Sequence, residues 1–325
     1  MDVRVEGDPN EVNSFVACMV AVTSAWGQPV SYDELAGLCG IAFSPPWNGE
    51  QATHWAVDGA ADRRISFLGA ALGFKVETLC VRNSPDKSLR HRSEAFRVFE
   101  TNADLVAALS EEFENGGTVL LKTWPSWAVV TRSSPEPEQV EFATLPWLEE
   151  LTRALQGPER AELAYVLTPR PPSLSPREAT LQAVRFGAFV ARGAQTEGRA
   201  GTLLGGACYD ACGRRLREPT FCSACPNDPA TCAHRVFRLL NRSQRSGEVF
   251  LGLAASALKR EVNDEPLSAA RAHYAELCRL TDRYLWLDSW KALWWDRDFR
   301  NVLADEFEKM SEHQEDAARE LARLV

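Results

Sequence analysis

Five of the nine cysteines lie in the short stretch between Cys208 and Cys232. Two of them form a C-x-x-C pair in a loop-like sequence, and tetrahedral zinc sites are often built on such a pair. The candidate ligands are Cys222, Cys225 and Cys232, with a fourth from His234, Cys208 or Cys212. The second pair, C-x-H, is spaced more tightly than usual. Three interpretations therefore stay open: a structural zinc, thiols packed in a helical core, or a redox or iron–sulfur role.

A further cysteine, Cys18, lies inside the first predicted helix and away from its apolar stripe. The stripe recurs at helical spacing and consists of Val12, Phe15, Val16, Met19, Val20 and Thr23. With about 100° per residue, Cys18 lies about 140° from this stripe. It shares its face with the small residues Ser14, Ala17, Ala21 and Ala25. Such a face suits either the wall of a cleft, where a thiol could act as a nucleophile, or close packing against another element.

The sequence around this cysteine resembles two groups of papain-like proteins. Both open with a cysteine-bearing helix, a glycine, an "sy-x-x-L" helix and a G-x-x-F turn. The matching residues here are Cys18, Gly27, Tyr32 with Leu35, and Gly40 with Phe43. The groups are the bacteriocin-processing cysteine peptidase domains and the N-terminal domain of butirosin biosynthesis protein H, an acyltransferase. The resemblance covers roughly residues 8–170 and implies a papain-like fold, with Cys18 at the nucleophile position.

The rest of the expected catalytic set departs from this pattern. Trp127 stands where the resemblance places the histidine base, and an indole N–H donates but cannot accept a proton. The next strand, EFATL, has no Asp or Asn to orient an imidazole. Asn13 lies at the position of the oxyanion donor, which is usually the longer glutamine. His54, with Asp58 four residues later, is the alternative candidate for a base.

The hydrophobic periodicity predicts helices in the first half, then strands, then an almost wholly helical second half. Asp8 and Pro9 should begin the first helix, which ends near Gly27, and Ser31 should cap the second. Further helices are predicted at about 60–72, 101–114, 147–156, 177–192, 200–216, 231–258, 264–285, 286–298 and 299–324. Strands are predicted at 75–81, 118–124, 127–133, 139–145 and 162–169.

These elements predict an α+β chain with two domains. A papain-like domain, with helices packed on a small antiparallel sheet, should span residues 1–170, and an all-α domain with the cysteine cluster should span 177–325. The proline-rich stretch 169–176 reads as the linker. In the last helix, Leu303, Phe307, Met310, Ala317, Leu321 and Leu324 form a stripe interrupted by Gln314. This stripe should pack on its own domain, with a homodimer contact as the alternative.

The composition and net charge of the chain limit the kinds of partner that we expect it to bind. The net charge of −9 opposes nucleic-acid binding, which needs a basic face. No apolar run reaches the roughly 18 residues of a membrane span, and no signal peptide is visible at the N-terminus. Nine cysteines without an export signal favour reduced thiols in the cytoplasm. The tryptophans Trp286, Trp290 and Trp294 recur on one helix face and predict a core seam, with a ligand-stacking surface as the alternative.

Three functions remain open from the sequence. The first is a non-catalytic papain-like scaffold that binds a peptide, an acyl carrier or a small metabolite in a bacterial biosynthetic pathway. The second is a cysteine-dependent acyltransferase or amide hydrolase that uses Cys18. The third is a metal- or redox-dependent protein centred on the cysteine cluster, in which structural zinc would be the cofactor.

Overall fold

The computed structural model describes the chain as an α+β protein with a six-stranded mixed sheet and a helical C-terminal part. The described residues are 3–7, 13–43, 47–48, 64–81, 95–123, 126–132, 141–144, 163–192, 202–203, 205–218, 229–259, 264–285 and 290–324. Packing divides the chain into two compact units. The sheet unit comprises residues 1–35 and 61–175, and the helical unit comprises 36–60 and 176–325. This division differs from the sequence-based one in assigning 36–60 to the helical unit.

The six strands of the sheet unit follow the order β3-β2-β7-β4-β5-β6. They are β2 (Phe74–Val81), β3 (Ala95–Phe99), β4 (Thr118–Thr123), β5 (Ser126–Arg132), β6 (Glu141–Ala143) and β7 (Leu163–Pro169). All neighbouring pairs are antiparallel except β2 and β3, which are parallel. The predicted purely antiparallel sheet is therefore wrong at this edge. β3 was not predicted, because its short and half-exposed run gives little periodic signal.

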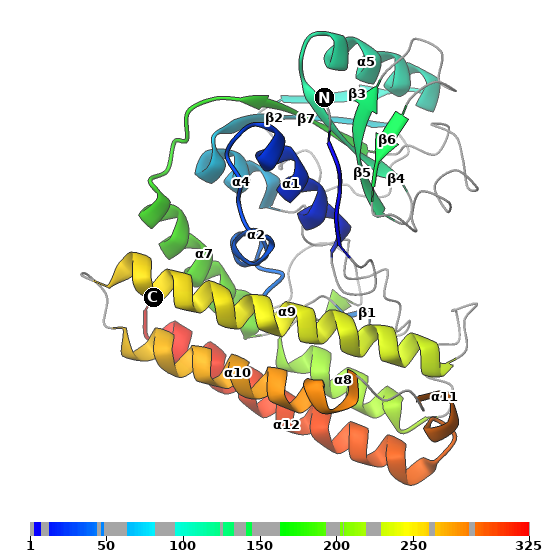
Figure 1. Ribbon diagram of the computed structural model, residues 1–325, viewed down its shortest axis with the longest axis vertical. Helices are drawn as coiled ribbons and strands as arrows, with labels where there is room; N and C mark the ends of the chain where they lie inside the picture. Colours follow the sequence, from blue (N-terminus) through cyan, green and yellow to red (C-terminus); the bar gives the residue numbers. More distant parts are fainter. Residues whose placement is uncertain are drawn as a thin grey trace. The chain divides into compact units, whose positions relative to one another are not determined.

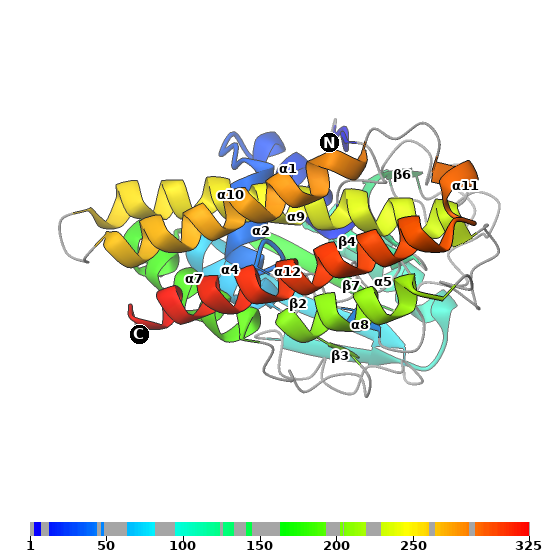
Figure 2. The same ribbon diagram turned by 90° about the horizontal axis from the view of Figure 1, so that it is seen from below.

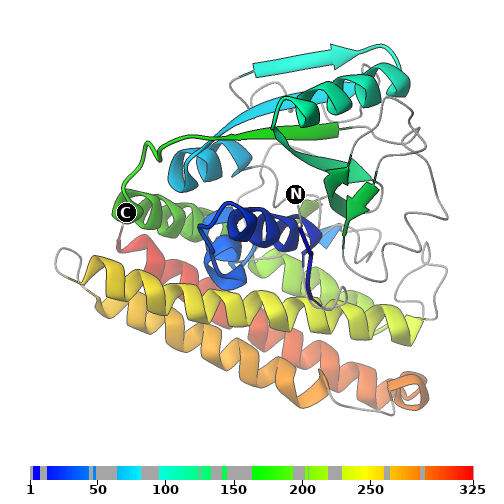
Figure 3. The same cartoon turned by 45° about the horizontal axis from the view of Figure 1, so that its top comes forward.

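The two faces of this sheet carry different side chains because successive residues of a strand alternate. One face packs against α5 (Asn102–Glu114), where aliphatic side chains of the helix and of the strands form a buried cluster. Its strand members are Leu79, Val119, Leu121, Val130, Ala164 and Val166. The opposite face carries Trp127 and Tyr165, and α1 (Ser14–Ala25) packs there against β5 (Figure 3).

Helix ends in the sheet unit follow local signals. Ser31 accepts from the Glu34 N–H at 3.2 Å and so caps α2 (Tyr32–Cys39), as predicted. Gly73, at φ +86°, ends α4 (Ile65–Leu72), as glycine readily does. The predicted start of α1 at Pro9 is wrong. The backbone of Asn13 is extended, so the helix begins after this residue. The Asn13 side chain caps the helix by accepting from the Val16 N–H at 3.1 Å. The predicted helix at 147–156 lies outside the described residues.

Long helices build the helical unit (Figures 1 and 2). They are α7 (Pro176–Ala191), α8 (Gly206–Leu216), α9 (Pro229–Leu258), α10 (Glu265–Leu285), the short α11 (Trp290–Leu293) and α12 (Arg297–Ala322). α10 packs between α9 and α12, and α12 also packs against α7 and α8. A two-residue ribbon pairs β1 (Trp47–Asn48) with β8 (Thr202–Leu203). Because β8 precedes α8, the helix predicted from residue 200 begins at Gly206. In the described part of the helix predicted at 286–298, α11 is followed by a break at 294–296 before α12 begins.

The apolar stripe of α12 lies inside the helical unit. Leu303, Phe307, Met310, Ala317 and Leu321 are fully buried, together with Gln314. Of the predicted tryptophan seam, Trp290 and Trp294 are buried as core residues, and Trp286 lies outside the described part of the chain. None of the helices in the described part is long and apolar enough to cross a lipid bilayer.

Candidate functional site

Cys18 lies in the second turn of α1 and is fully buried, with an exposed fraction of 0%. Its thiol donates to the backbone carbonyl oxygen of Trp127, with sulfur and oxygen 3.5 Å apart. The two residues are 109 positions apart in the sequence. The structure therefore brings together the predicted nucleophile position and the position where a histidine base would be expected.

The small-residue face of α1 packs against β5. Ser14, one turn before Cys18, accepts a hydrogen bond from the Trp127 N–H at 3.0 Å. Ser14 and Cys18 thus hold the N–H and the C=O of the same residue. Thr144 also donates to the Trp127 carbonyl oxygen, at 3.0 Å. At Ser14 and Cys18 this face of α1 lies closely against β5, whereas Ala25, at the end of the helix, is exposed.

The Trp127 side chain is a core residue with an exposed fraction of 0%. Its indole stacks on the Tyr165 ring, with centroids 5.2 Å apart and planes 9° apart. The edge of Phe15 meets it at 5.3 Å, and the Lys122 ammonium lies 5.4 Å from its centroid. The indole N–H is buried and has no hydrogen-bond partner among the described residues. This ring therefore fills space and donates nothing to the Cys18 thiol.

Asn13, the predicted oxyanion donor, lies at the start of α1. Its side-chain oxygen is committed to the helix cap described above, and its backbone N–H donates to the Tyr32 hydroxyl at 2.8 Å. Asn13 is buried, with 2% exposed. His54 lies outside the described residues, and the described part of the sheet unit contains no histidine. Within the described part of the sheet unit, there is therefore no imidazole that could accept a proton from the Cys18 thiol.

The predicted metal ligands in the helical unit are not assembled in the described part of the chain. Cys208 and Cys212 lie on α8, where burial raises the pKa of both thiols. His234 bonds through Nε2 to the Leu285 carbonyl oxygen at 3.0 Å, and its ring packs on Trp290. The structure does not describe Cys222, Cys225 or the side chain of Cys232. Among the described residues, no group of three or more His, Cys, Asp or Glu side chains could hold a metal ion.

A buried polar network in the helical unit was missed from the sequence. The Thr281 hydroxyl accepts from the Asn241 amide at 2.7 Å and lies 2.9 Å from the Gln244 side-chain oxygen. The Gln244 amide in turn donates to the Tyr209 hydroxyl at 3.2 Å. The network joins α8, α9 and α10 through buried groups. The signal in the sequence is a set of polar residues at buried positions of helical stripes.

The G-x-x-F turn of the sequence motif is anchored inside the helical unit. Tyr274 donates to the Phe43 carbonyl oxygen at 2.8 Å, and the Gln314 amide donates to the same oxygen. The Phe43 ring meets the edges of Phe250 and Tyr274. A Cβ at Gly187 would lie 2.6 Å from this ring, so a glycine is required for the close approach. Gln314, the interruption in the α12 stripe, therefore holds the turn.

Comparison with known proteins gives no assignment. Neither the models of known protein families nor the curated protein sequences match this chain.

Proposed function

We propose that this chain is a non-catalytic member of the papain-like proteins, which binds a partner without carrying out acyl transfer or hydrolysis. The single observation that carries the proposal is the environment of Cys18. Its thiol is fully buried and donates to a backbone carbonyl oxygen. A nucleophilic thiol must instead meet a substrate carbonyl and be activated by a neighbouring base.

The neighbours of the thiol support the same conclusion. The β5 backbone lies against Cys18, and both Ser14 and Thr144 hold it there. A substrate carbonyl would have to displace this strand. A thiolate would also face the partial negative charge of the Trp127 carbonyl oxygen, without the hydrogen that now bridges the two atoms. The site therefore favours a neutral thiol with a packing role.

The indole of Trp127 supports the proposal in a second way. It occupies the position of the base but stacks on Tyr165 and cannot accept a proton. Replacing this tryptophan by histidine would remove a stacked core ring and leave the thiol buried. We therefore attribute the proposed loss of catalysis both to the packing of α1 against β5 and to the Trp127 side chain.

From the papain-like resemblance, we propose a partner of the kind that the resembling proteins process: a peptide, an acyl carrier or a small metabolite in a bacterial biosynthetic pathway. The proposed location is the cytoplasm. In this role the chain would hold the partner while another protein performs the chemistry.

Intact-mass analysis with an acyl-pantetheine thioester tests the proposal. The full-length chain is incubated with the thioester and compared with Cys18→Ala, which lacks the thiol. We expect no acyl adduct that depends on Cys18 and no thioester cleavage above the variant's rate. A Cys18-dependent adduct that forms and turns over would overturn the proposal in favour of an acyltransferase or hydrolase.

Alkylation provides an independent check. Iodoacetamide is applied to the native chain and to the chain unfolded in guanidinium, and the modified cysteines are identified by peptide mass. We expect Cys18 to be protected in the native chain and alkylated in the unfolded one. Native alkylation of Cys18 faster than of an ordinary exposed thiol would contradict the proposed packing role.

A further inference from the structure

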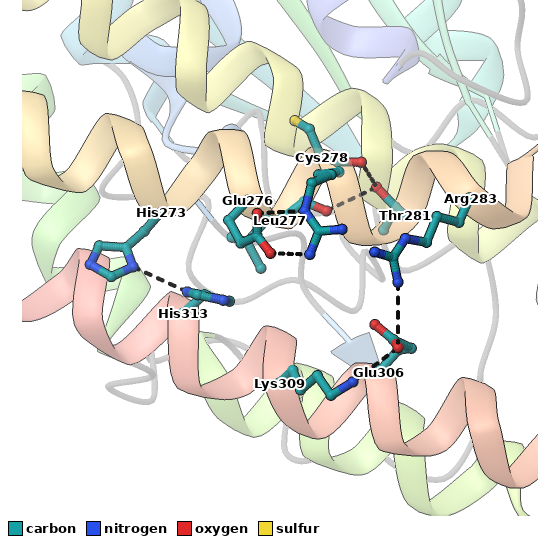
Figure 4. A network of polar contacts seen from close by, with 10 residues as sticks. His273, Glu276, Leu277, Cys278, Thr281, Arg283, Glu306, Lys309 and His313 are labelled. Carbon is teal, nitrogen blue, oxygen red and sulfur yellow. Dashed lines mark hydrogen bonds and ion pairs between the residues drawn. The ribbon is translucent and has the colours of Figure 1, made fainter.

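Two histidines meet across the seam between α10 and α12. His273 Nδ1 and His313 Nδ1 are 3.2 Å apart, and both rings are half-buried (Figure 4). The ring centroids are 5.5 Å apart and the planes are inclined by 47°. Because the separation of the centroids is about as large as the nitrogen distance and the two centroid-to-nitrogen distances together allow, the nitrogens face each other almost head on. This is the geometry of a hydrogen bond between imidazoles.

Such a bond requires two different tautomers. A neutral imidazole has one N–H donor and one acceptor nitrogen. One ring must therefore carry its hydrogen on Nδ1, and the other must carry it on Nε2. The bond exists only while at least one of the two rings is neutral.

A bound metal ion would need a different arrangement. Two imidazoles that share a cation direct their lone pairs to a common point, whereas these nitrogens point at each other. The described part of the chain also offers no third ligand positioned to complete a group here. The pair is therefore interpreted as a proton-binding site.

We propose that the His273–His313 hydrogen bond is an acid-sensitive latch between α10 and α12. The first proton can add to the outer nitrogen of the donor ring, which leaves the Nδ1–H···Nδ1 bond intact. A second proton can add only to the accepting Nδ1. That step replaces the hydrogen bond by two N–H groups and two positive charges that face each other across the seam.

The charges around the pair set the direction of the response. Burial lowers the pKa of His273, the proximity of His313 and Arg319 lowers it further, and Glu320 opposes them. Glu276, on α10, interacts electrostatically with His313, and its carboxylate is paired with Arg279. These charged groups come from α10 (Glu276 and Arg279) and from α12 (Arg319 and Glu320), the two helices that carry the imidazoles.

The sign follows from linkage between proton binding and folding. With the pKa of His273 below its ordinary value of about 6.5, the unfolded chain binds this proton first as the pH falls. The stability that the neutral pair contributes is thus present above about pH 6.5. It is lost as the pH falls through the lower value of the folded chain, and the α10–α12 seam weakens in acid.

A double-mutant cycle on the full-length chain tests the latch. Thermal unfolding midpoints are measured for wild type, His273→Gln, His313→Gln and the double variant, at about pH 7.5 and about pH 5. At the higher pH we expect a favourable coupling of about 2–4 °C. At the lower pH the coupling should be smaller, because protonation of both rings replaces the hydrogen bond by two like charges.

The matched control is His234→Gln, which removes a histidine of the same unit that bonds to a backbone carbonyl oxygen instead of another ring. The shifts of the unfolding midpoint caused by His234→Gln and His313→Gln should add at both pH values. NMR titration with labelled histidine gives a second readout: His313→Gln should raise the pKa of His273. A coupling of the same sign and size at both pH values, or an unmoved His273 titration, would refute the latch.

Discussion

The sheet unit and the helical unit bury their polar groups in different ways. In the described part of the sheet unit, ladders pair the backbones of neighbouring strands, and Ser14, Cys18 and Thr144 bond to the N–H and C=O of Trp127 in β5. In the helical unit, the helices satisfy their own backbones, and side chains form the long-range bonds. Examples are the Tyr209–Gln244–Thr281 network and the capture of the Phe43 carbonyl oxygen.

This difference changes how a buried polar side chain should be interpreted. The Cys18 thiol is one of two side-chain donors to the Trp127 carbonyl oxygen, the other being the Thr144 hydroxyl, so the oxygen keeps a partner without it. A glutamine or threonine between helices carries bonds that no backbone group replaces, because helical N–H and C=O groups are already paired. Substitutions in the helical unit should therefore cost more than substitutions at Cys18.

The largest expected effect is that of Phe43→Ala. Phe43 is 1% exposed and packs against Phe250, Tyr274 and the backbone at Gly187. Its truncation should lower the free energy of unfolding of the helical unit by about 3–5 kcal/mol. Hydrogen exchange followed by mass spectrometry would show the loss as faster exchange in α9, α10 and α12.

Phe15→Ala is the matched control for this variant, because Phe15 is equally buried but lies in the sheet unit against Trp127. It should accelerate exchange in α1 and β5. If Phe43→Ala instead accelerated exchange in the strands and left the long helices protected, the assignment of residues 36–43 to the helical unit would be wrong.

A smaller effect is expected for Thr281→Val, which keeps the shape of the side chain and removes the hydroxyl. The Asn241 amide and the Gln244 oxygen would lose a partner inside the helical core. An unsatisfied buried polar group costs about 1–3 kcal/mol. Chemical denaturation would measure the loss, and Thr281→Ser, which retains the hydroxyl, should recover most of it. Equal losses in both variants would mean that the hydroxyl contributes little.

The smallest effect is expected for Cys18→Ala. The variant loses one weak sulfur hydrogen bond and a small volume, while Thr144 still donates to the same carbonyl oxygen. We expect a loss of about 1 kcal/mol in the same denaturation assay. A loss as large as that of Phe43→Ala would remove the contrast between the two units and make Cys18 a principal element of the sheet-unit core.

Local signals predicted much of the secondary structure. The strong periodicity of the second half placed the helix at 264–285, which is observed as α10 from Glu265 to Leu285. Capping residues were less reliable: Ser31 caps α2 as predicted, whereas α1 begins after Asn13 instead of at Pro9. Both signals depend on neighbours within a few residues, so they can be identified without the fold. The candidate site was predicted less completely, because its contacts join residues that are far apart in the chain.

The sequence by itself predicted the long described helices and five of the six strands of the sheet, and it identified Cys18 and Trp127 as positions that the papain-like resemblance pairs. Tertiary structure decided what those positions do. Packing against β5 buries the thiol against a carbonyl oxygen, and stacking on Tyr165 makes Trp127 a core ring. It also decided that Phe43 belongs with the C-terminal helices and that His273 meets His313. These outcomes depend on long-range packing and desolvation, which local periodicity does not encode.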